Sequence, residues 1–160
     1  MRISWELNLM PLDPHLILLL HVAATWFMVG LIWLIQQVHY PLFASVGAEH
    51  FRDYEVAHTR RITPVVGVAM LTEAATGAAL VFTPVGAAHP YVLGGSLALL
   101  ALIWLSTAFL QVPMHTQLSA GFDAASHRFL VRSNWLRTVA WSARGVLVLY
   151  LLSPIGPGAA

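Results

Sequence analysis

The chain contains no cysteine and no lysine, and it carries little charge of either sign. The absence of cysteine excludes disulfide bonds, thiolate metal ligands and cysteine nucleophiles. Only 9% of the residues are charged, whereas a soluble domain carries about a quarter, so there is too little charge to cover a surface that faces water. A formal net charge of +1 gives no reason to expect a nucleic-acid partner. Because 58% of the residues are hydrophobic, we expect an integral membrane protein.

What the sequence does contain is a set of apolar windows, each long enough for a helix that crosses the roughly 30 Å hydrocarbon core of a bilayer. We expect spans at residues 16–38, 64–82, 91–112 and 136–152. The predicted fold is therefore all-α, with a single domain over residues 1–160. It is an antiparallel four-helix bundle in the membrane, with a short cytoplasmic interfacial helix between spans one and two.

Proline positions predict where several spans begin and end. Thr63 and Pro64 have the pattern of an N-cap followed by a proline in the first turn, so span two is predicted to begin there. Pro113 is predicted to end span three, because proline interrupts helical hydrogen bonding. The segment before the first span, which includes Arg2, is expected to lie at the membrane interface and not to be a cleaved signal.

The arginines predict an orientation, because positively charged loops remain in the cytoplasm. Most of the eight basic residues flank the two longer loops, and an even number of spans puts both termini on the opposite side. We therefore expect a protein of a bacterial inner membrane with both termini non-cytoplasmic. The flanking residues are Arg52, Arg60, Arg61, Arg128, Arg132 and Arg137.

One acid and one base fall near the middle of predicted spans. Glu73 lies in span two and Arg144 in span four, at depths that allow them to meet. A lone charge at this depth costs at least about 2.5–3.5 kcal/mol, which favours pairing. Two interpretations remain open: the pair fixes the register of the helices, or it forms a proton or anion site.

Several histidines gather at the predicted cytoplasmic end. His39 ends span one, His58 precedes span two and His115 follows span three. Glu55 and His58 have the Glu-x-x-His spacing by which one helix offers a carboxylate and an imidazole to one metal. Three imidazoles and a carboxylate suit iron, copper or zinc. The alternative is an interfacial helix whose histidines face headgroups and water.

Haem is a less favoured cofactor. His39 and His115 are in principle able to ligate a haem from opposite sides of the bundle. Both residues lie near helix ends rather than in the middle of a span. A transition metal, iron or copper, is therefore the preferred expectation.

Two stretches carry a family likeness. Residues 111–118 read Gln-Val-Pro-Met-His-Thr-Gln-Leu, and residues 134–138 read Asn-Trp-Leu-Arg-Thr at the start of span four. This pattern resembles the anthrone oxygenase-like family of small four-span membrane proteins. The resemblance implies oxygenation of a hydrophobic aromatic substrate with little use of cofactors. His115 departs from the family, which usually has asparagine there. The matching residues are Pro113, His115, Leu118, Asn134, Arg137 and Thr138.

The leading hypothesis is a membrane-embedded oxidoreductase, an oxygenase, acting on a lipophilic small molecule that enters from the bilayer. His39, Glu55, His58 and His115 are the predicted metal ligands, with the histidines as alternative general bases. Arg137 with Asn134 is expected to stabilise an enolate or oxyanion. Glu73 and Arg144 complete the candidate catalytic residues, and Gln36 and Gln111 are expected to orient the groups.

Two other classes remain open. One is a non-catalytic accessory subunit of a larger membrane complex that binds partner helices, haem or pigment. The expected partners also include further copies of the chain, in a homo-oligomer. A transporter with Glu73 and Arg144 as its midplane site is the third reading. It is disfavoured because the spans show neither broken helices nor an inverted repeat.

Overall fold

The computed structural model describes residues 13–153. The predicted interfacial segment at the amino-terminus, with Arg2, lies outside these residues. The part described is all-helical and contains no strand. The elements are α1 (Pro14–Leu34), π-helix η1 (Ile35–His39), α2 (Tyr40–Leu42), 3₁₀-helix η2 (Phe43–Ser45), α3 (Ala48–Leu80), α4 (Pro84–Ala88), α5 (Pro90–Ser106), π-helix η3 (Thr107–Gln111), α6 (Val112–Leu118) and α7 (Ala124–Tyr150).

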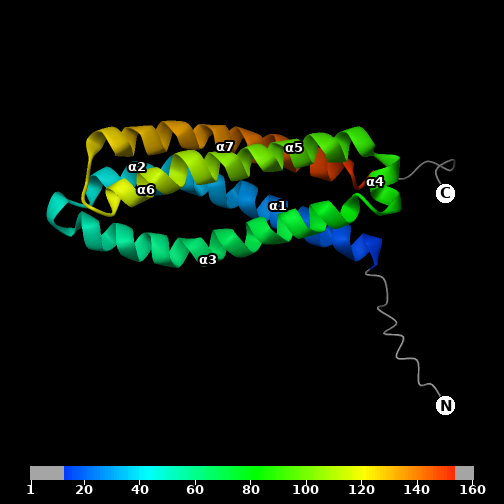
Figure 1. The fold of residues 1–160 in the computed structure, drawn as a ribbon, viewed down its shortest axis with the longest axis horizontal. Helices are drawn as coiled ribbons and strands as arrows, with labels where there is room; N and C mark the ends of the chain where they lie inside the picture. Colours follow the sequence, from blue (N-terminus) through cyan, green and yellow to red (C-terminus); the bar gives the residue numbers. More distant parts are fainter. Residues whose placement is uncertain (1–12, 154–160) are drawn as a thin grey trace, which may run out of the picture.

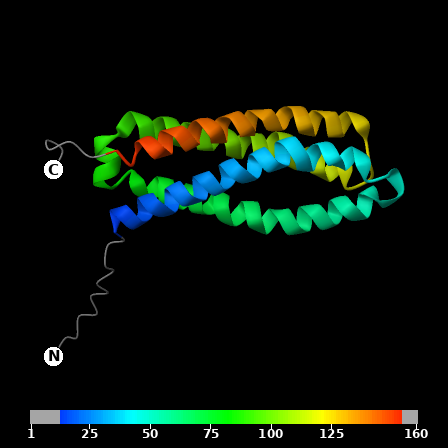
Figure 2. The same ribbon diagram turned by 180° about the vertical axis from the view of Figure 1, so that it is seen from behind.

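The long helices lie side by side along the length of the molecule (Figures 1 and 2). α1 begins and α7 ends at the same end, where α4 also lies. The opposite end contains α2, the start of α3, α6 and the start of α7. Residues near 39, 55 and 115 are therefore neighbours although they are far apart in sequence. This second end contains the candidate site.

The interior of this assembly contains many polar side chains beside its hydrophobic clusters, and its surface carries many large apolar side chains. At the surface, Val68, Phe109 and Val146 are 67%, 72% and 67% exposed. A surface of this kind is suited to hydrocarbon, and polar side chains in a membrane protein face inward. Buried polar side chains come from all the long helices and include His21, Thr25, Gln36, Glu55, Glu73, Gln111, Asn134, Thr138 and Arg144.

Three helical stretches in the described part of the chain are long and apolar enough to cross a membrane, which indicates a membrane protein. α7, which contains the predicted fourth span, is not among them. Its mean hydropathy is lowered by polar residues such as Asn134, Arg137 and Arg144, all of which are buried inside the protein. The three stretches are Pro14–Ser45, Ala48–Leu80 and Pro90–Leu118.

The prediction that span two begins at Thr63 and Pro64 is wrong. α3 is one continuous helix from Ala48 to Leu80, so the separate interfacial helix before residue 62 does not exist. Pro64 has no N–H to donate to the carbonyl of Arg60, four residues back, and the helix nevertheless continues through it. Thr63 Oγ1 donates to the carbonyl of Thr59 at 2.6 Å.

The prediction that Pro113 ends span three is also wrong, because the helix continues to Leu118. Pro113 lies just after η3, and Pro41 has the same position after η1. In each case the residue before the proline donates its N–H to the carbonyl five residues back. A proline ring clashes with the carbonyl four residues back, and the wider π turn moves this carbonyl aside.

Asp123 caps the amino-terminus of α7. Its carboxylate accepts a hydrogen bond from the Ser126 backbone N–H at 2.6 Å, and this bond holds the pKa of Asp123 below its ordinary value of 3.8. A carboxyl with a depressed folded-state pKa contributes stability above its unfolded pKa and loses it as pH falls through the folded pKa. The Tm advantage of the parent over Asp123→Ala should therefore shrink between about pH 4 and about pH 2.

Thermal unfolding of detergent-purified protein measures this change. Asp123→Asn is the matched control, because asparagine caps a helix without titrating. Its advantage over Asp123→Ala should not depend on pH. A parent advantage that stays constant down to about pH 2 would contradict the role assigned to the carboxylate.

Candidate metal centre

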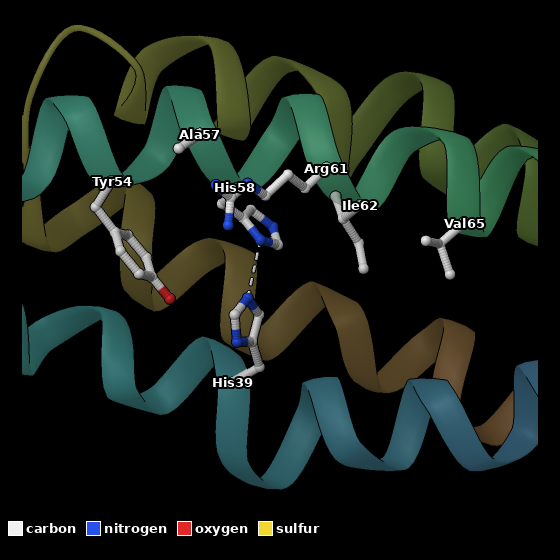
Figure 3. A pocket seen from close by; sticks show the side chains of 7 residues that line it. All are labelled: His39, Tyr54, Ala57, His58, Arg61, Ile62 and Val65. Atoms are coloured by element: carbon white, nitrogen blue, oxygen red, sulfur yellow. Dashed lines mark hydrogen bonds between the residues drawn. The ribbon is translucent and has the colours of Figure 1, made fainter.

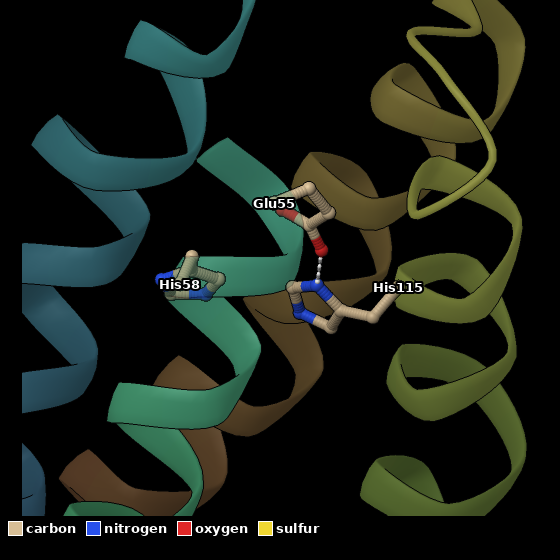
Figure 4. Close-up of side chains that lie close together, drawn as sticks. All are labelled: Glu55, His58 and His115. Atoms are coloured by element: carbon tan, nitrogen blue, oxygen red, sulfur yellow. Dashed lines mark hydrogen bonds and ion pairs between the residues drawn. The ribbon is translucent and has the colours of Figure 1, made fainter. Parts of the chain in front are cut away.

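The predicted metal ligands lie together at the end of the molecule that contains α2 and α6. His39 is the last residue of η1, Glu55 and His58 lie one turn apart on α3, and His115 lies on α6. One ligand atom each from Glu55, His58 and His115 lies within 4.8 Å of the others. Figure 4 shows His115 pointing across from α6 toward the two residues on α3.

Glu55 and His115 form a short hydrogen bond. Nδ1 of His115 lies 2.5 Å from Oε1 of Glu55, and because an ionised carboxylate only accepts, Nδ1 is the donor. Nε2 of His115 then accepts from the Tyr40 hydroxyl at 2.9 Å. Glu55 is completely buried, and within residues 13–153 its second oxygen has no hydrogen-bond partner. A buried carboxylate oxygen of this kind is costly unless a cation or donor satisfies it.

His39 supports the cluster from the other side. Its Nε2 shares a hydrogen bond of 2.9 Å with Nδ1 of His58, which leaves Nε2 of His58 available to a metal. This is the arrangement in which an outer group fixes the ring of a ligating histidine. The structure thus places His39 behind His58 rather than within the close group of ligand atoms.

A cavity of about 430 Å³, here called the outer cavity, lies beside this pair. Figure 3 shows His39 on the helix opposite α3, with its ring directed at His58. The lining residues are His39, Tyr54, Ala57, His58, Arg61, Ile62 and Val65. The outer cavity gives small molecules a path to the cluster, with one cation, Arg61, at its wall.

A second cavity, here called the inner cavity, reaches the cluster at His115 and has a volume of about 220 Å³. Its polar lining comes from Tyr40, Thr63, Thr107, Gln111, His115 and Arg137. Its apolar lining includes Ile35, Ile62, Val66, Met70, Trp104 and Val112. A mostly apolar hollow with a few convergent polar groups is the usual form of a small-molecule site.

Arg137 is a buried cation without a carboxylate partner. It is 4% exposed, and none of the ion pairs among the described residues includes it. Nη1 donates to Oδ1 of Asn134 at 3.3 Å, the guanidinium lies 5.1 Å from the centroid of the Trp141 ring, and Nε has no partner. A guanidinium left in this state attracts an anion, since burying an unpaired charge is expensive.

Amide side chains hold Asn134 and the inner cavity in place. Asn134 Nδ2 donates to Gln36 Oε1 at 2.9 Å, and Gln36 Nε2 donates to the carbonyl of Val131 at 3.2 Å. Gln111 accepts from Ser106 at 3.0 Å and donates to Ser133 at 3.2 Å. Gln36 and Gln111 lie in η1 and η3, respectively, and π turns of this kind often occur at functional sites.

Glu73 and Arg144 meet in the middle of the molecule, away from His39, His58 and His115. Both are completely buried, and Nη1 of Arg144 forms an ion pair with Oε1 of Glu73. Trp141 Nε1 donates to the other oxygen of Glu73 at 3.1 Å, and Arg144 Nε donates to the Ser96 carbonyl at 3.0 Å. Neither Glu73 nor Arg144 lines the inner or outer cavity.

The donor set fits a catalytic transition metal. Two imidazoles and one carboxylate with open coordination positions are the ligands of non-haem iron(II) oxygenases, and the same set binds catalytic zinc. A haem between His39 and His115 fits less well. The ring of His58 lies between them, with centroids 4.6 Å from His39 and 5.5 Å from His115.

Tyr40 is a site residue that the sequence did not single out. Tyr40 adjoins His39 in the sequence, and its hydroxyl lies 2.9 Å from Nε2 of His115. His127 fixes the backbone beside it, with Nε2 2.8 Å from the Tyr40 carbonyl oxygen. Trp141 shares a helix face with Arg137 and Arg144, and the sequence spacing predicts this.

No protein-family model, curated protein or solved structure matches this chain. The resemblance to the anthrone oxygenase-like family therefore rests on the motif residues alone.

Proposed function

We propose that the protein is a membrane-embedded, metal-dependent oxidoreductase, an oxygenase, that acts on a lipophilic substrate in the inner cavity. The observation that carries the proposal is the close group of Glu55, His58 and His115, whose ligand atoms lie within 4.8 Å of one another beside an apolar cavity. The preferred metal is iron(II), because two histidines and one carboxylate are the ligands it has in non-haem oxygenases.

The membrane topology belongs to the same proposal. α7 is taken as the fourth span of an antiparallel four-helix bundle, because its polar residues are buried while Val139 and Val146 are 62% and 67% exposed. The cluster end is the cytoplasmic end of a protein in a bacterial inner membrane. Five of the six flanking arginines are exposed near that end, and only Arg137 is buried.

Each residue has a defined role in the proposed reaction. Glu55, His58 and His115 hold the metal, and the bound metal supplies the redox chemistry that uses dioxygen as oxidant. His39 and Tyr40 orient the imidazoles of His58 and His115.

The substrate is held by residues of the inner cavity. Arg137, fixed by Asn134, stabilises negative charge on a substrate oxygen. The apolar wall formed by Val66, Met70 and Trp104 excludes water from the reacting part of the substrate.

Metal analysis of the detergent-purified full chain tests the proposal. We expect about one iron per chain after reconstitution with iron(II) under argon, and the loss of this iron in His115→Ala. His50→Ala is the matched control, because His50 lies on the same helix as His58 but its side chain is 79% exposed. It should retain the iron of the parent.

Three outcomes contradict the proposal in different ways. If the parent protein binds well below one iron per chain, the metal-dependent function is contradicted. Selective retention of zinc with no oxygen consumption points to hydrolytic rather than redox chemistry. Co-purification with a partner membrane complex, without metal, favours the accessory subunit.

A further inference from the structure

We infer that the substrate is a single-chain amphiphile with a carboxylate head, whose tail lies in a groove between α3 and α5. The inference rests on the proposed function for the identity of the inner cavity as a substrate site. It adds the chemical class of the substrate and the path by which it is held. Three observations carry the inference. The groove adjoins the inner cavity, Arg137 has no carboxylate partner among the described residues, and small side chains line the groove.

The groove has a volume of about 480 Å³ and lies between α3 and α5. Its wall on α3 includes Ala74 and Ala78, and its wall on α5 includes Leu97, Ala101 and Trp104. Trp104 also lines the inner cavity, so the two hollows adjoin at this residue. The combined path runs along the helices from His115 toward the opposite end of the molecule.

The length of the combined path suits a ligand with a long acyl tail. From Gly67, in the inner cavity, to Ala78, in the groove, α3 rises by about 16 Å at 1.5 Å per residue. Alanine side chains on facing helices leave the groove open to the bilayer, so a tail enters sideways from lipid. The groove alone would accept any acyl chain, and its selectivity must come from the head.

Arg137 supplies that selectivity. It is one buried positive charge with an unpartnered Nε, and no carboxylate of the described chain neutralises it. The other polar residues that line the inner cavity near it, Tyr40 and Gln111, are uncharged. One guanidinium among uncharged neighbours matches a singly charged carboxylate, which accepts two hydrogen bonds in the plane of an arginine fork.

Displacement of cis-parinarate fluorescence from the detergent-purified full chain measures this binding. Oleate should displace the probe at roughly 10- to 100-fold lower concentration than oleyl alcohol, which has the same tail and no charge. Dioleoylphosphatidylglycerol, an anionic lipid with two chains, should compete no better than oleyl alcohol. Equal displacement by oleate and oleyl alcohol, or stronger displacement by the phospholipid, overturns the inference.

Variants separate the head site from the groove. Arg137→Gln should abolish the preference for oleate over oleyl alcohol, and Arg137→Lys should keep part of it. Ala101→Trp should weaken both ligands by filling the groove. Arg132→Gln and Val146→Trp are the matched controls, because both residues are exposed on α7 outside the groove and cavities. A preference for oleate that survives in Arg137→Gln contradicts the head site.

The same titration distinguishes the inference from the function on which it rests. It is performed on metal-free protein and on protein loaded with iron(II). If the protein binds oleate selectively but holds no iron, the amphiphile site is supported and the oxygenase function is contradicted. If the protein binds one iron per chain but shows no preference for oleate, only the proposed substrate class is contradicted.

Discussion

Replacing Glu73 by glutamine should destabilise the protein by about 3 kcal/mol, the cost of leaving a buried charge without its partner. Arg144 is completely buried, and its Nη2 already has no hydrogen-bond partner. Glutamine keeps the shape of the side chain, but its one carbonyl oxygen accepts from either Arg144 or Trp141, and its NH2 group then faces the other donor. The loss therefore reports the carboxylate, with its charge and its second acceptor oxygen, rather than the packing. Unfolding in micelles with an increasing fraction of sodium dodecyl sulfate measures the difference.

The double variant Glu73→Gln/Arg144→Met is the control for this result. Replacing a buried ion pair by apolar groups is often neutral, so the second substitution should restore most of the lost stability. If Glu73→Gln is as stable as the parent, the structural role of the pair is refuted. A stable Glu73→Gln variant that loses turnover would instead assign the pair to the chemistry.

The second large effect is expected at Glu55. Glu55→Gln should weaken iron(II) binding by more than about 100-fold, since even the loss of an outer partner of a ligand costs 10- to 100-fold. The glutamine carbonyl still accepts the hydrogen bond from His115 Nδ1, so the fold and the ring orientation are retained. What is lost is the only carboxylate among the three grouped ligands. Competition against a chromophoric chelator measures the affinity.

Glu49→Gln is the matched control for this measurement. Glu49 lies on the same helix, and its side chain is 83% exposed. Its removal changes the net charge by the same amount without touching the cluster. Iron affinity equal to the parent in both variants would show that Glu55 is not a ligand.

The helical fold follows from the sequence because the apolar windows are long, but the helix ends do not. Pro64 and Pro113 carry the usual signals for a boundary, and both lie inside helices. In the first case the helix continues although Pro64 has no N–H for the carbonyl of Arg60. In the second case a π turn before Pro113 makes room for the proline ring. Both outcomes depend on local geometry that a list of residue types does not contain.

The candidate site was only partly predictable for a related reason. The Glu-x-x-His spacing fixes Glu55 and His58 on one face of α3 whatever the rest of the chain does. The sequence also predicts that His115 approaches Glu55 and His58, because the helices that carry them have matching lengths. The contact between His115 and Tyr40 does not follow from the sequence, because it requires Tyr40, near a helix end, to be buried in the interior. The unpaired state of Arg137 is a property of the packed interior and has no sequence signal.

The two wide turns before the prolines have a consequence for how tolerant this site is to change. Each π turn adds one residue to an otherwise α-helical register, and one residue corresponds to a rotation of about 100°. Deleting a single residue from η3 would swing His115 by that angle, away from Glu55, without altering any ligand. The position of the proposed metal ligands is thus encoded in helix length, and length changes there are expected to be as damaging as the loss of a histidine.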